Sequence, residues 1–87
     1  MRWYRLAAEQ GLASAQGTLG FMYANGRGVP QDYVQAHMWF NLAASRSTGE
    51  LRDSSVRNRD RAADELTPDG LNEAQRLVRE RDAAHPS

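Results

Sequence analysis

The sequence predicts an all-α fold in which about five helices stack as a short solenoid. Three observations support this prediction. A segment of the chain recurs after 36 residues, apolar residues follow helical spacing on both sides of a glycine-rich turn, and the composition describes one small domain. The chain has 87 residues, no cysteine, and 11 Lys+Arg against 11 Asp+Glu. A chain this short buries only about 60–65% of its unfolded surface, so its core is marginal.

A tryptophan-containing segment forms the internal repeat. Residues Trp39–Ala44 follow Trp3–Ala8 by 36 residues and keep the tryptophan, an aromatic residue, the leucine and both alanines. Self-similarity at periods of about 20–50 residues is typical of repeat architectures such as helix-pair solenoids. The repeat therefore predicts stacked helical units.

Between the two copies, the sequence predicts a helix over residues 12–25. Its apolar residues fall on one stripe, and they are Leu12, Ala15, Leu19, Met22 and Tyr23. Gly26 ends this helix, because glycine accepts the left-handed conformation of a helix C-cap. The loop 27–30 follows, since the residue before Pro30 is held extended.

A second helix is predicted from Asp32, as its N-cap, to Arg46. Apolar residues cover nearly its whole circumference, which is typical of a helix that is buried on more than one side. Residues 47–49 break this helix. A charged helix is then expected over 50–66, and Thr67-Pro68 begins a last amphipathic helix. The segment 47–87 is therefore expected to form the C-terminal capping helices of the array.

The stretch from Trp3 to Ala44 resembles the Sel-one-like repeat (SLR) family, a relative of tetratricopeptide repeats. The residues that carry the resemblance are Trp3-Tyr4, Ala7-Ala8-Glu9-Gln10-Gly11, Ala15-Gln16, Leu19-Gly20, Met22-Tyr23, the link Asn25–Tyr33 and Ala36-x-x-Trp39-Phe40. The resemblance implies a right-handed α-α superhelix, with a half repeat at 1–11 and a full repeat at 12–46. It also implies a non-enzymatic scaffold or adaptor that binds a protein or peptide on its concave surface.

Catalytic, metal and cofactor sites are not predicted. The two histidines are His37, in the middle of a helix, and His85, in the tail, and they lack the spacing of metal ligands. The segment Asn25–Gly28 follows a helix and lacks the lysine of a phosphate loop. Neutral charge with interleaved signs argues against nucleic acid as a partner, and no apolar run reaches the length of a membrane span. A cytoplasmic location is expected only if Met1 is the natural start, which the sequence leaves open.

The predicted binding surface is the face of helix 12–25 opposite Leu19 and Tyr23. In tetratricopeptide-like solenoids the first helix of each pair lines the concave groove, so the resemblance makes this face the ligand side. Phe21 is the expected apolar anchor there. The accompanying polar candidates are Ser14, Thr18, Asn25 and, from the adjoining loop, Arg27. The alternative is that Phe21 packs beneath the first helix or the tail.

A second function is kept open, in which the chain is a structural self-association module. A stable helical array needs about three repeats, and this chain has fewer. The first helix would then present an open apolar edge, formed by Trp3, Tyr4 and Leu6, that pairs with another chain. The sequence does not identify the partner or the oligomeric state.

Overall fold

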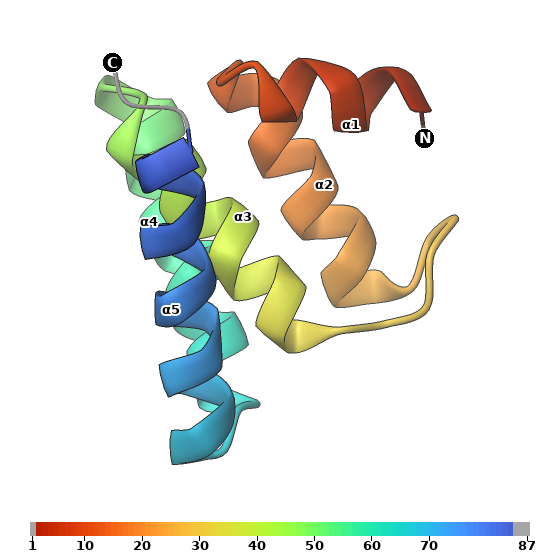
Figure 1. Ribbon diagram of the computed structural model, residues 1–87, viewed down its shortest axis with the longest axis vertical. Coiled ribbons are helices and arrows are strands. Elements are labelled where there is room, and N and C mark those ends of the chain that lie inside the picture. The colour runs from red at the N-terminus through yellow and green to blue at the C-terminus, as the bar shows by residue number, and fades with distance from the viewer. Residues whose placement is uncertain (1, 85–87) are drawn as a thin grey trace.

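The computed structural model describes residues 2–84, which form an all-α array (Figure 1). Its five helices are α1 (Arg2–Glu9), α2 (Ala13–Asn25), α3 (Tyr33–Ser45), α4 (Gly49–Asp64) and α5 (Pro68–Ala84). No strand occurs within this described range. The predicted fold class is thereby confirmed, and helices α2, α3 and α4 begin and end within two residues of their expected bounds. Residues 85–87 of the expected capping segment lie outside the described residues.

Helix α3 is the centre of the array. It packs against α2 on one side and against α4 and α5 on the other. Helix α1 crosses the start of α2, and its N-terminal half projects away from α4 and α5 (Figure 1). The array is therefore open at α1, and α3 is covered on several sides.

The apolar residues of α3 build most of the core. Trp39, Met38 and Leu42 are fully buried together with Leu19 of α2. This is the burial expected for a helix that is apolar around its circumference. Because α3 supplies so much of the buried surface, the other helices are positioned mainly by their contacts with it.

A glycine sets the close approach of α2 to α3. A Cβ atom at Gly20 would lie 2.8 Å from Cδ1 and Cε1 of Phe40, well inside the ordinary carbon–carbon contact distance of about 3.5–4.0 Å. Phe40 is itself buried in the core. The absence of a side chain at position 20 therefore lets the ring of Phe40 lie directly against the backbone of α2.

The turn between α2 and α3 is held at both ends. Gly26 adopts a left-handed conformation with φ of 67°, and its N–H donates to the carbonyl of Met22. The carboxylate of Asp32 accepts from the backbone N–H groups of Val34 at 3.0 Å and Gln35 at 3.2 Å. These contacts satisfy helix-end groups that would otherwise lack partners, and they confirm the two predicted caps.

Arg81 connects three helices. Its guanidinium lies 4.4 Å from the ring centroid of Trp39 in α3, and its Nη1 lies 3.3 Å from Oε1 of Glu9 in α1. A second link joins α1 to α2, because Nε2 of the buried Gln16 donates to the carbonyl of Ala8 at 3.0 Å. Together these contacts attach α1 to the rest of the array.

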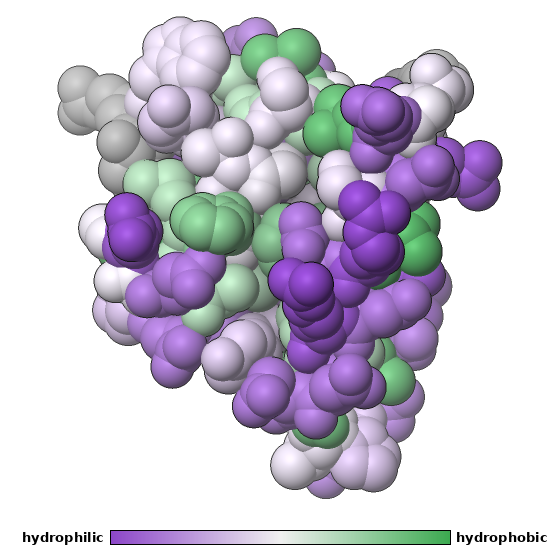
Figure 2. Space-filling view, turned by 180° about the vertical axis from the view of Figure 1, so that it is seen from behind, coloured by the Kyte–Doolittle hydropathy of each residue, from purple (hydrophilic) through white to green (hydrophobic). Residues whose placement is uncertain are grey.

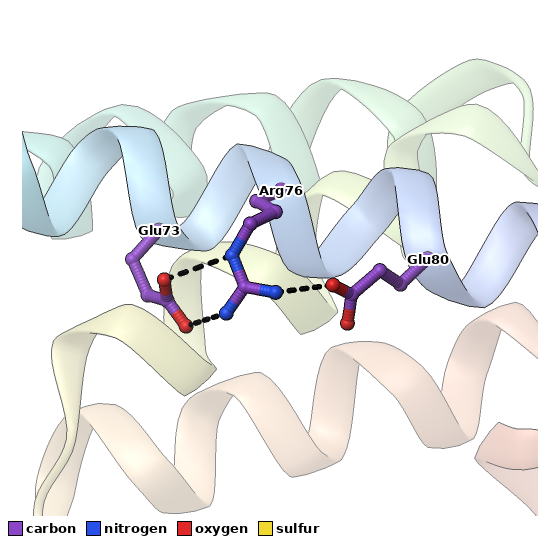
Figure 3. A network of polar contacts seen from close by, with 3 residues as sticks. All are labelled: Glu73, Arg76 and Glu80. Atoms are coloured by element: carbon purple, nitrogen blue, oxygen red, sulfur yellow. Dashed lines mark hydrogen bonds and ion pairs between the residues drawn. The ribbon is translucent and has the colours of Figure 1, made fainter.

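The solvent-facing side of α5 carries an ion-pair network (Figure 3). The Arg76 guanidinium binds the carboxylates of both Glu73 and Glu80, one helical turn before and after it. The hydrogen bond and the charge of Glu73 raise the pKa of Arg76. These exposed residues keep their charges paired along the helix, so this side of α5 is a solvated surface.

Candidate functional site: the groove between α2 and α4

Two adjoining hollows lie between α2 and α4, with α3 beneath them. Their volumes are about 390 and 290 Å³, and both are lined by Phe21, Phe40 and Asn58. We call the pair the α2–α4 groove. Figure 2 shows the molecule from behind, where apolar patches lie exposed beside a region of hydrophilic side chains.

The smaller hollow lies at the N-terminal ends of α2 and α4. The residues that line this N-terminal hollow are Ser14, Gly17, Thr18, Phe21, Phe40, Leu51, Ser54, Ser55 and Asn58. Of these described residues, none carries a charge. A Cβ atom added at Gly17 would meet no other atom within 4 Å. The N-terminal hollow is therefore an uncharged space with room for an apolar side chain.

The larger hollow lies at the C-terminal ends of the same helices. The residues that line this C-terminal hollow are Phe21, Ala24, Asn25, Tyr33, Phe40, Asn58, Arg61, Ala62, Asp64 and Glu65. Every charged residue of the groove belongs to this end, with two carboxylates and one guanidinium. The groove is thus uncharged at one end and charged at the other.

Four of the five predicted binding residues line the α2–α4 groove: Ser14, Thr18, Phe21 and Asn25. Phe21 is 52% exposed, and α4 of the C-terminal segment lies across the groove from it. It is therefore not buried beneath α1 or the described part of the tail, which was the alternative placement. Arg27 is exposed in the loop after α2 and does not line either hollow.

The polar side chains of α2 are partly used within the helix. The hydroxyl of Thr18 donates to the carbonyl of Ser14 at 2.9 Å, and Nδ2 of Asn25 donates to the carbonyl of Phe21 at 2.9 Å. The amide oxygen of Asn25 remains an acceptor. These residues therefore offer mainly acceptor atoms to a ligand in the groove.

The sequence reasoning missed the α4 side of the groove. Leu51, Asn58 and Asp64 face Phe21 across it, together with Arg61 and Glu65. The detectable repeat ends near Ala44, so no sequence signal paired these residues with α2. The helical spacing of 51, 54, 58, 61 and 65 on one face was the available signal.

The predicted open edge on α1 is only partly exposed. Trp3 is 63% exposed and Leu6 is 56% exposed. Their repeat equivalents, Trp39 and Leu42, are 0% and 2% exposed. Tyr4 was grouped with this edge from the sequence, but it is half-buried and packs against the core. Its ring lies edge-on to Trp3, with the centroids 5.0 Å apart.

His37 is the buried histidine of α3. Burial lowers the pKa of His37, and the nearby charge of Arg59 lowers it further, whereas Asp60 raises it. Nδ1 of His37 has no hydrogen-bond partner among the described residues. Within residues 2–84 no cluster of three metal-ligating side chains is present, and none of the helices there has the length and apolarity needed to cross a membrane.

Comparisons with known proteins agree with this architecture. The sequence matches the Sel1 repeat over residues 1–12 and 13–47. The chitin synthase regulator SKT5 of Malassezia restricta is 41% identical over 56 residues, which cover 64% of this chain and 4% of that protein. A crystal structure of a protective antigen from uropathogenic Escherichia coli strains, which displays an SLR fold, is 38% identical with a TM-score of 0.83. The match covers 93% of this chain and 17% of the antigen's chain.

Proposed function

The chain belongs to the Sel1 repeat family, and on that premise we propose that it is a non-enzymatic module that docks a peptide segment of a partner protein in the α2–α4 groove. Helical-repeat arrays of this family generally mediate protein–protein interactions. The observation that carries the proposal is the position of Phe21, a half-exposed aromatic ring between two hollows.

The α2–α4 groove has the physical properties of a peptide site. Aromatic residues, Phe among them, are enriched in protein interfaces, where they fill pockets of the partner. Phe21 supplies such a ring, Phe40 forms the floor beneath it, and Gly17 leaves space beside it. An apolar side chain that enters the N-terminal hollow would bury surface against both rings, and the polar atoms around them would orient the peptide backbone.

The test is selection from a random-peptide display library, followed by binding measurements on variants of the full chain. Phe21→Ser removes the ring, and Gly17→Leu fills the N-terminal hollow without a steric conflict at Cβ. Selected peptides should lose at least tenfold in affinity for both variants, about 1.4 kcal/mol. Gln75→Leu adds the same side chain to an exposed position of α5 and should leave affinity unchanged. Circular dichroism confirms that each variant remains folded.

Two outcomes contradict the proposal. Selected peptides that bind Phe21→Ser and Gly17→Leu as tightly as the original chain would occupy another surface. A library that yields no peptide above background on the folded chain would leave the groove without a peptide ligand.

Self-association through α1 is the second candidate function. It is favoured by the contrast between Trp3 and Trp39, which are equivalent in the repeat but opposite in exposure. Sedimentation velocity over a range of protein concentrations measures it. We expect a concentration-dependent rise in mass that Trp3→Ser abolishes and Phe21→Ser does not. A chain that stays monomeric at tens of micromolar and folded contradicts it.

A further inference from the structure

We propose that the α2–α4 groove selects peptides in which a Lys or Arg side chain lies about two residues from the apolar anchor. The cation would lie at Asp64 and Glu65 in the C-terminal hollow, and the anchor would lie beside Phe21 and Phe40. This inference rests on the proposed docking function and assigns the chemistry of the partner segment.

The charge of the groove is unevenly distributed. Asp64, Glu65 and Arg61 line the C-terminal hollow, which leaves one net negative charge there. Asp64 and Glu65 form no ion pair with another side chain of the described residues. Two carboxylates that share their hollow with a single guanidinium and form no ion pair, beside an apolar ring, favour a ligand that brings a positive charge.

Helix direction adds to this polarity. The N-terminal hollow contains Ser14 of α2 and Leu51 of α4, whereas the C-terminal hollow contains Asn25 and Asp64. The two helices therefore run in the same direction along the groove. Both direct the negative end of the helix dipole toward the C-terminal hollow.

Asp64 and Glu65 lie at the end of α4 where a negative charge is least favourable. Helix C-termini stabilise cations and destabilise carboxylates, and Glu65 is the C-cap residue of α4. Arg61, in the last turn, offsets part of this repulsion. A ligand cation would offset the remainder, so its binding is favoured over that of a neutral or acidic side chain.

The spacing follows from helix geometry. Phe21 and Asn25 are four residues apart in α2, which is about 6 Å along the helix axis at 1.5 Å per residue. An extended peptide advances about 3.3 Å per residue. A side chain beside Phe21 and a cation near Asn25 and Asp64 are therefore separated by about two residues of extended peptide.

The other charges of α4 do not cancel this preference. Glu50, Asp53 and Arg57 surround a separate hollow on the flank of the helix, which meets the groove only at Ser54. Arg59 forms an ion pair with Asp60 at 3.2 Å, and neither residue lines the groove. The charges that face a ligand in the groove are therefore those of Arg61, Asp64 and Glu65.

Three synthetic pentapeptides, blocked at both ends, test the proposal by NMR titration of the full chain. Gly-Phe-Gly-Arg-Gly carries anchor and cation, Gly-Phe-Gly-Glu-Gly reverses the charge, and Gly-Ala-Gly-Arg-Gly removes the anchor. We expect the first to shift the backbone amides of Gly17, Phe21 and Asn25. It should bind about fivefold more tightly than the charge-reversed peptide at low salt. The double variant Asp64→Asn, Glu65→Gln should bring this ratio close to one, as should about 0.5 M salt.

The outcomes separate the charge preference from docking itself. Equal binding of the arginine and glutamate peptides, with shifts in the groove, overturns the charge preference and leaves peptide docking standing. No groove shifts from any of the three peptides, together with a failed library selection, overturns both. If dilution of the protein alone reproduces the shifts, the occupant is a second copy of the chain, and the proposal is overturned.

Discussion

Two glycines three residues apart in α2 provide a test of the packing described above. Replacement of glycine by alanine inside a helix favours folding by about 0.4–1 kcal/mol, because it restricts the unfolded chain and improves helix propensity. At Gly17 nothing lies within 4 Å of the added Cβ atom. We therefore expect Gly17→Ala to raise the free energy of unfolding by about 0.4–1 kcal/mol.

The same substitution at Gly20 should have the opposite sign. Its Cβ atom would lie 2.8 Å from two ring atoms of Phe40, so the ring must move by roughly 1 Å to reach a normal contact distance. Phe40 is buried, and overpacking of a core costs about 1–3 kcal/mol. After subtraction of the helix-propensity gain, Gly20→Ala should destabilise the chain by up to about 2.5 kcal/mol.

Urea unfolding, followed by circular dichroism, compares the two variants with the original chain. For a small domain the dependence on urea is of the order of 1 kcal/mol/M. The midpoints of Gly17→Ala and Gly20→Ala should therefore differ by about 1–3 M, in opposite directions from the original. Equal shifts in the two variants, or a more stable Gly20→Ala, would refute the inferred contact between α2 and Phe40.

Three further predictions concern a helix cap, a buried histidine and a bridging arginine. Asp32→Ala removes the cap of α3 and should cost about 0.5–2 kcal/mol in urea unfolding, whereas Asp32→Asn should retain most of the stability. Because burial lowers the pKa of His37, the unfolded chain binds its proton first as the pH falls below about 6.5. Stability that is present above that pH should therefore decline toward pH 5. His37→Gln should reduce this decline when the free energy of unfolding is measured at a series of pH values. An unchanged dependence on pH would contradict the conclusion that His37 causes the decline. Arg81→Gln should cost about 1 kcal/mol through the lost contacts with Trp39 and Glu9. Arg79→Gln, on the exposed side of α5, should have little effect.

Several helix ends were predictable because local signals mark them. Gly26 and Asp32 mark the turn between α2 and α3, and both act there as the sequence indicates. Thr67 does the same for α5, since its hydroxyl accepts from the N–H of Gly70 at 3.1 Å. Caps and periodicity depend on neighbours within a few residues, so they are visible without knowledge of the fold.

The binding groove was only half predictable, because it is made by residues far apart in sequence. The apolar stripe of Leu19 and Tyr23 identifies the buried face of α2, and Phe21 follows as the opposite face. The partners of Phe21 on α4 depend on how α4 lies against α3. The helical spacing of Asn58 and Glu65 groups them on one face of α4, but it does not say which helix that face meets, since the repeat has faded by that point of the chain.

The repeat also shows why equal sequence does not imply equal burial. Trp3 and Trp39 occupy equivalent positions, yet only Trp39 is covered, because Arg81 and the rest of α5 lie against α3. The exposed edge at α1 therefore depends on which helices lie beside it. Phe21 is different: it is exposed although α2 is flanked by its neighbours, because the open hollows between α2 and α4 lie above Phe40. Coverage of Trp3 by another chain would bury the edge at α1, whereas occupation of the α2–α4 groove would bury Phe21 and leave Trp3 exposed. This physical difference is the reason that self-association and peptide docking can be separated by Trp3→Ser and Phe21→Ser.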